Sequence, residues 1–147
     1  MAASARARER QEAKRQHARA RRPAAATIAA VMMILAGILS LGNSYLILAS
    51  SIVFGWLIVG IFGLLSITAG VGLFQRADWA YRVGVNFAIM DIFVGFVAVL
   101  GAFNIQFAVL GWSGIGQAIG TSILILGAIS LFLVTRREVR HYYEGFV

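Results

Sequence analysis

The sequence predicts an all-α fold: a polytopic membrane protein built as an up-down bundle of four transmembrane helices, with both termini in the cytoplasm. Two observations on composition predict it. Apolar residues make up 60% of the chain and charged residues 13%, whereas soluble domains have about 45–50% and about 25%. The charges are also segregated, because only four residues between positions 23 and 135 are ionised at neutral pH: Arg76, Asp78, Arg82 and Asp91.

The third observation is that the apolar residues form four long segments, which together define a transmembrane domain over residues 23–135. The segments cover about residues 24–48, 52–74, 80–103 and 108–134. Each exceeds the roughly 20 residues that cross a hydrocarbon core of about 30 Å. In lipid the backbone must satisfy its own hydrogen bonds, which predicts four helices. The connections are short, so neighbouring helices should run antiparallel.

The distribution of Lys and Arg predicts the orientation. Of the thirteen basic residues, eight lie in an N-terminal tail (1–22), two around the second connection and three in a C-terminal tail (136–147). Basic residues favour the cytoplasmic side, so we expect both tails and the second connection there, in a plasma membrane. Arginines near the membrane boundary are expected to contact anionic lipid headgroups: Arg19, Arg21, Arg22, Arg76, Arg82, Arg136 and Arg137. Trp79 and Tyr81 are predicted at the same boundary, with Tyr142 and Tyr143 just beyond it.

Several functional classes have little support in the sequence. The chain has no cysteine, and its two histidines, His17 and His141, lack metal-ligand spacing. It has no nucleophile elbow and no phosphate-binding loop. We therefore expect no enzyme activity, no cofactor and no metal site. Aromatic residues are absent from the arginine-rich tail, which argues against nucleic acid as a partner.

Small residues predict the faces through which the helices pack, since they let helix backbones approach closely in lipid. The third segment has a stripe at steps of four, three, four and three: Gly84, Ala88, Asp91, Gly95 and Ala98. The fourth segment has a GxxxG pair, Gly116 and Gly120. A short pattern of glycine, two apolar residues, a small residue and another apolar residue recurs at Gly37, Gly63, Gly95 and Gly127. It indicates either a duplicated helical hairpin or chance.

Asp91 is the ionisable residue expected deepest in the membrane, about 17 Å from the inner boundary at 1.5 Å per residue. Such a residue faces other helices or marks a functional site. Counting depth along the helices places Gln117 and Thr121 nearest to it. Asn86 lies nearer the inner boundary than Asp91, and Ser66 and Thr68 lie at a depth similar to that of Asn86. Asp91 could join helices, pair with another subunit, or serve as a proton- or cation-coupled transport site.

The second connection reads Gln75-Arg76-Ala77-Asp78, then Trp79-Ala80-Tyr81-Arg82. An apolar helix end, a short basic loop and a boundary tryptophan resemble the middle of small four-helix integral membrane proteins of unknown function, common in actinobacteria. The resemblance covers this loop and the four-helix layout. It implies a four-helix membrane fold and no particular site residues.

Two functional hypotheses follow. The first is a non-catalytic membrane protein, either an accessory subunit or a homo-oligomeric scaffold packed through the small-residue faces. The second is a small oligomeric transporter or channel for protons or cations that uses Asp91. A weaker third possibility is that the arginine-rich tail tethers a soluble protein or nucleic acid to the membrane.

Overall fold

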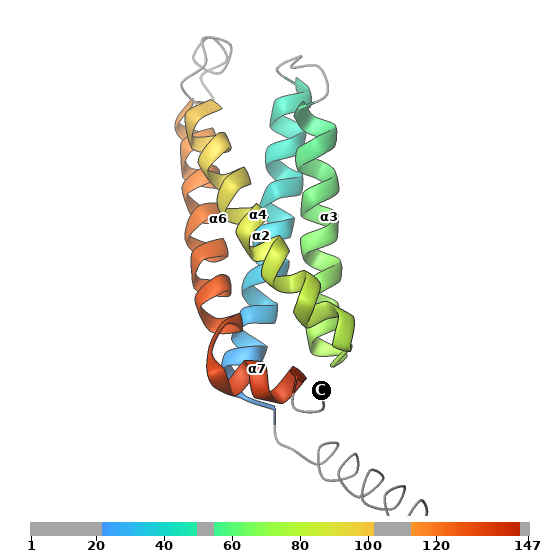
Figure 1. The fold of residues 1–147 in the computed structure, drawn as a ribbon. Helices are drawn as coiled ribbons and strands as arrows, with labels where there is room; N and C mark the ends of the chain where they lie inside the picture. Colours follow the sequence, from blue (N-terminus) through green and yellow to red (C-terminus); the bar gives the residue numbers. More distant parts are fainter. Residues whose placement is uncertain (1–21, 50–54, 102–112, 145–147) are drawn as a thin grey trace, which may run out of the picture.

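The computed structural model describes residues 22–49, 55–101 and 113–144, and these residues form five helices and no strand. The predicted all-helical fold is therefore confirmed for this part of the chain. Four of the helices are long and apolar enough to cross a membrane. The helices are α2 (Ala24–Ala49), α3 (Gly55–Phe74), α4 (Asp78–Gly101), α6 (Ser113–Val134) and α7 (Arg137–Glu144) (Figure 1). Residues 52–54 and 108–112, where two segments were predicted to begin, lie outside the described residues.

The four long helices pack as two sequential pairs, α2 with α3 and α4 with α6, and α2 also packs along α6. Helix α4 is strongly inclined: it runs diagonally from beside the end of α3 to the far end of α6 (Figure 1). It therefore contacts α3 with its first half and α6 with its second. Large apolar side chains stay exposed around the bundle, among them Phe93 at 62% and Phe132 at 61%.

The turn from α3 to α4 is a Schellman motif centred on Arg76, which has a positive φ of 61°. The Arg76 amide donates to the carbonyl of Leu73 (3.2 Å), and the Ala77 amide donates to the carbonyl of Gly72 (3.0 Å). These bonds satisfy carbonyls that the helix end leaves without partners. The usual residue at this position is glycine, so Arg76 holds a strained backbone conformation.

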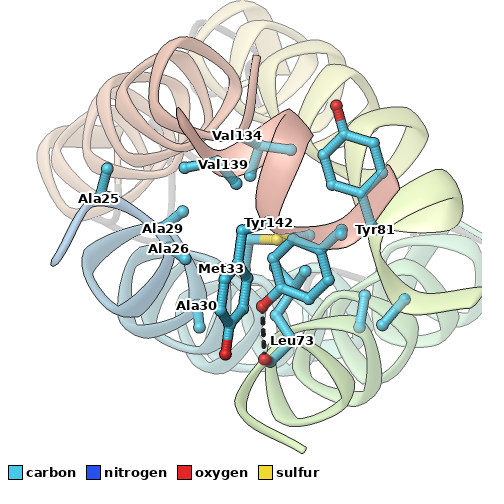
Figure 2. Packing of buried hydrophobic residues seen from close by; sticks show 13 residues of the cluster. Ala25, Ala26, Ala29, Ala30, Met33, Leu73, Tyr81, Val134, Val139 and Tyr142 are labelled. Carbon is cyan, nitrogen blue, oxygen red and sulfur yellow. Dashed lines mark hydrogen bonds between the residues drawn. The ribbon is translucent and has the colours of Figure 1, made fainter. Parts of the chain in front are cut away.

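Residues 136–147 were predicted to be a tail, but within them Arg137–Glu144 forms a helix that folds back onto the bundle. Helix α7 lies across the end of the bundle where α2 and α4 begin (Figure 1), and we call this the α7 end. Val139, Tyr142 and Tyr143 are buried at i, i+3 and i+4, one face of a helix. Figure 2 shows the buried cluster that they join, which includes Ala25, Ala26, Ala29, Ala30, Met33, Leu73, Tyr81 and Val134.

Candidate functional site

The carboxyl group of Asp91 lies in the interior of the bundle, on the face of α4 that meets both α3 and α6. Its side chain is 1% exposed. The hydroxyl Oγ of Ser66 on α3 lies 2.6 Å from Asp91 Oδ2. On the α6 side, a Cβ at Gly127 would lie 3.1 Å from the Cβ of Asp91, so glycine lets α6 approach closely there. Asp91 is thus enclosed within a single chain rather than turned toward a second subunit.

Ser66 links Asp91 to a third helix. Its Oγ also lies 3.2 Å from the backbone carbonyl oxygen of Met33 on α2, and the Ser66 side chain is fully buried. A serine hydroxyl has one proton to donate and lone pairs to accept with. The three oxygens therefore form a short hydrogen-bonded series across α2, α3 and α4.

The structure does not bring the predicted polar neighbours to Asp91. Gln117 is half-buried, and both Thr121 and Asn86 are exposed. The physical reason is rotation about the α6 axis: Gly127 faces Asp91, and Thr121 precedes it by six residues, about 240° around a helix of 3.6 residues per turn. Depth counted along each helix also fails as a guide, because α4 is inclined. Ser66, which the sequence placed at the depth of Asn86, is the residue that reaches Asp91.

The predicted small-residue faces lie inside the bundle. Gly84, Ala88, Gly95, Gly116 and Gly120 are buried, and Ala98 is partly buried. A Cβ at Gly95 would lie 2.5 Å from the Leu124 backbone nitrogen, and one at Gly120 would lie 2.7 Å from that of Val99. Gly95 and Gly120 therefore pack α4 against α6 within one chain, whereas a Cβ at Gly84 would lie 3.7 Å from Leu73 Cδ1 of α3 and from Met33 Cε of α2.

Three of the four recurring motifs place a serine three residues after the glycine: Ser40, Ser66 and Ser130, each fully buried. Only Ser66 has the carboxyl partner described above. The Oγ atoms of Ser40 and Ser130, and the Nδ2 atom of Asn43, have no hydrogen-bond partner among the described residues. Because buried polar groups are nearly always hydrogen-bonded, these three atoms are exceptions that need a physical account.

The arginines predicted to bind headgroups divide into three groups. Arg22 donates a hydrogen bond to the Phe74 carbonyl, and the Arg76 guanidinium lies 4.2 Å from the ring centroid of Tyr142. The side chains of Arg22 and Arg76 therefore contact the protein itself. Arg82, Arg136 and Arg137 are exposed, and Arg136 lies over the ring of Phe132. Arg19 and Arg21 lie outside the described residues.

Two features were missed from the sequence: the bond from Ser66 to Asp91 and the docking of α7. The spacing of Val139, Tyr142 and Tyr143 is a signal that predicts an amphipathic helix. No comparable signal selects Ser66 over Thr68. Thr68 is exposed and donates to the Leu64 carbonyl of its own helix at 2.8 Å.

In chemical terms, the interior offers one carboxyl group, hydroxyl groups and a backbone carbonyl. The described part of the chain holds no group of three or more His, Cys, Asp or Glu side chains that could bind a metal ion. A carboxyl group can bind or release one proton, and a hydroxyl group can donate one hydrogen bond and accept others. Comparison with protein-family models, with curated proteins and with solved structures finds no match to this chain.

Proposed function

We propose that this chain is a non-catalytic, four-span integral membrane protein of the plasma membrane that associates with a partner within the bilayer. The exposed apolar side chains of α2, α3, α4 and α6 suit a lipid environment. The described arginines lie toward the α7 end, which supports placing that end and both termini in the cytoplasm. The exposed Arg82 and Arg137 are the side chains best placed to contact anionic headgroups.

The observation that carries the association is the exposed carboxamide of Asn86. No described residue donates a hydrogen bond to it or accepts one from it, and it lies well inside the apolar span of α4. A polar group left without partners in lipid costs free energy. A side chain of this type commonly forms hydrogen bonds between transmembrane helices. We infer that another transmembrane segment covers Asn86.

The face around Asn86 has the spacing of a helix-packing seam. Trp79, Arg82, Ile89, Phe93, Phe96 and Leu100 are exposed on α4. Together with Asn86 they follow steps of three and four residues. A single asparagine in such a seam selects register and partner. The covering segment belongs either to a foreign subunit, which makes this chain an accessory protein, or to a second copy, which makes it a homo-oligomeric scaffold.

The test replaces Asn86 by Leu and measures native mass in mild detergent, with every co-purifying chain identified. The matched control is Thr68→Val, since Thr68 is also exposed but is satisfied within its own helix. We expect the wild type and the control to carry a stoichiometric partner or second copy that N86L loses. A wild-type monomer without a partner, or an N86L protein that keeps it, would reject the proposal.

Orientation has its own test, because the chain has no native cysteine. Single cysteines at Arg137 and at Tyr45, which is 70% exposed near the opposite end of α2, should react with an impermeant maleimide from opposite sides. In intact cells we expect labelling of Y45C alone. Labelling of R137C alone would reverse the orientation.

A second candidate function is proton- or cation-coupled transport through Asp91. The specific observation in its favour is the set of buried polar atoms without protein partners: Ser40 Oγ, Asn43 Nδ2 and Ser130 Oγ. Purified protein in proteoliposomes should then support a flux that Asp91→Asn abolishes. Wild-type vesicles with no flux of protons or common cations would dismiss this candidate.

A further inference from the structure

The oxygens of Asp91, Ser66 and Met33 are arranged in a series that has two complete hydrogen-bonding patterns. The Ser66 hydroxyl lies between the carboxyl oxygen Oδ2 at 2.6 Å and the Met33 carbonyl oxygen at 3.2 Å. With Asp91 ionised, the hydroxyl donates to the carboxylate. With Asp91 protonated, the carboxyl O–H donates to Ser66 Oγ, and the Ser66 hydroxyl turns to donate to the Met33 carbonyl. Hydrogen-bonding capacity allows both, since a hydroxyl donates once and accepts twice.

We propose that Asp91, Ser66 and the Met33 carbonyl form a buried proton-binding site, in which rotation of the Ser66 hydroxyl keeps Asp91 hydrogen-bonded in both protonation states. One proton joins or leaves a carboxyl oxygen, and no other covalent bond is made or broken. The site rests on the membrane location proposed above. It depends neither on the partner at Asn86 nor on transport.

The distances favour a proton as the ligand over a metal ion. A separation of 2.6 Å between oxygens is the length of a strong O–H···O hydrogen bond. Two oxygens bound side by side to one Mg²⁺, each at about 2.1 Å, lie about 3 Å apart, and the larger Ca²⁺ separates its ligands further. The oxygens of Ser66 and Asp91 are too close together for either arrangement, and a hydrogen bond accounts for their spacing.

The long helices that surround the site carry no second charge close to Asp91. Helices α2, α3 and α6 contain no Asp, Glu, Lys, Arg or His. The other charged residues of α4, Asp78 and Arg82, lie in its first two turns, and Arg82 is exposed. Uptake of a proton therefore changes the net charge where three helices meet. Such a change alters how strongly they are held together.

Two buried serines, Ser40 and Ser130, have hydroxyls without a hydrogen-bond partner among the described residues and lie on either side of the site. A Cβ at Gly63 would lie 3.1 Å from the Cβ of Ser40, and Gly63 precedes Ser66 by three residues. Gly127, which faces Asp91, precedes Ser130 by three residues, a rise of about 4.5 Å along α6. The course of the helices puts Ser130 nearer the α7 end than Asp91 and Ser40 farther from it.

The experiment is infrared spectroscopy of the full-length protein in lipid bilayers, recorded over a pH titration. The chain has only two aspartates, so ¹³C-aspartate labelling of the Asp78→Asn variant reports on an unaltered Asp91. We expect a protonated-carboxyl C=O band that disappears on raising the pH and shifts in D₂O. Ser66→Ala should move this band to higher frequency and shift its titration midpoint. Ser122→Ala should do neither, because Ser122 is exposed and donates to the Ala118 carbonyl of its own helix.

The outcomes separate this site from the proposed functions. A missing band at every pH, or a band indifferent to Ser66→Ala, would overturn the proton site. If added Na⁺ displaced the band at constant pH, the ligand would be a metal cation instead of a proton. That result would also overturn the proton site. A titrating band without flux in proteoliposomes would keep the site and reject transport. Loss of the partner in N86L with an unchanged band would show that association and proton binding are independent.

Discussion

The hydroxyl of Tyr143 donates a 2.6 Å hydrogen bond to the backbone carbonyl of Leu73, which joins α7 to the last turn of α3 across 70 residues of sequence. This bond is the dashed line at Leu73 in Figure 2. The Tyr143 ring also stacks on Tyr81 at 5.5 Å between centroids and meets the edge of Tyr142 at 5.0 Å. These contacts connect the C-terminal helix to α3 and α4. They close the α7 end of the bundle beneath Met33, whose carbonyl belongs to the Asp91 site.

Replacing Tyr143 by Phe should loosen α7 without removing its apolar contacts. The lost hydrogen bond is worth about 1 kcal/mol, so we expect α7 to open roughly fivefold more often. Hydrogen exchange of the α7 amides measures this directly. Tyr45→Phe is the control, since Tyr45 is 70% exposed. Equal exchange in both variants would show that this hydrogen bond does not hold α7.

Docking of α7 should weaken at alkaline pH. Burial raises the pKa of Tyr143 to about 12, with a further increase from Tyr142, while Arg22 and Arg76 oppose the rise. A tyrosine on an undocked helix ionises near pH 10. Docking is therefore unaffected below about pH 10 and is lost progressively as the pH approaches 12, because the undocked state releases its proton first. The difference in tyrosinate absorbance between the wild type and Y143F should rise near pH 12. A rise near pH 10 would contradict the burial of the Tyr143 hydroxyl.

Alanine at Gly37 should separate α2 from α3. Its Cβ would lie 2.5 Å from the Gly63 carbonyl oxygen and 3.0 Å from the Ile67 backbone nitrogen. Backbone atoms cannot rotate aside, so the helices must move apart at a cost of about 1–3 kcal/mol. Gly42→Ala is the matched control on the same helix, because nothing lies within 4 Å of its Cβ. It should be neutral or gain up to about 1 kcal/mol from helix propensity. Denaturant unfolding in detergent measures the stability of both variants. A Gly42→Ala protein less stable than the Gly37→Ala protein would be inconsistent with this packing.

Two substitutions at Arg76 should separate backbone strain from side-chain contact. Arg76→Ala loses the contact with Tyr142 and keeps the positive φ of 61°. Arg76→Gly loses the same contact but tolerates that φ, so it should be more stable than R76A by about 1 kcal/mol. Thermal unfolding compares the two variants. If R76A were as stable as R76G, or more stable, the left-handed conformation of residue 76 would be wrong.

The sequence predicted the secondary structure well because helix formation in apolar segments is local. The segment that begins at residue 24 was predicted to end at 48, and α2 covers Ala24–Ala49. The contacts of Asp91, by contrast, are not local. Burial on the small-residue face follows from the stripe of Gly84, Ala88 and Gly95, but the partner depends on the tilt and rotation of neighbouring helices. The long helices are apolar on nearly every side, so hydrophobic periodicity does not report which side faces inward.

By itself, the sequence determined that four long apolar helices form and that the basic residues gather beyond and between particular segments. Those properties depend on segment length and charge. The tertiary structure alone decided that Ser66 rather than Gln117 or Thr121 meets Asp91, that the other helices of the chain leave Asn86 exposed, and that α7 packs against Leu73. The reason is that these contacts join residues far apart in sequence. Close approach of backbones at a few glycines sets their geometry, and no local pattern of hydrophobicity encodes it.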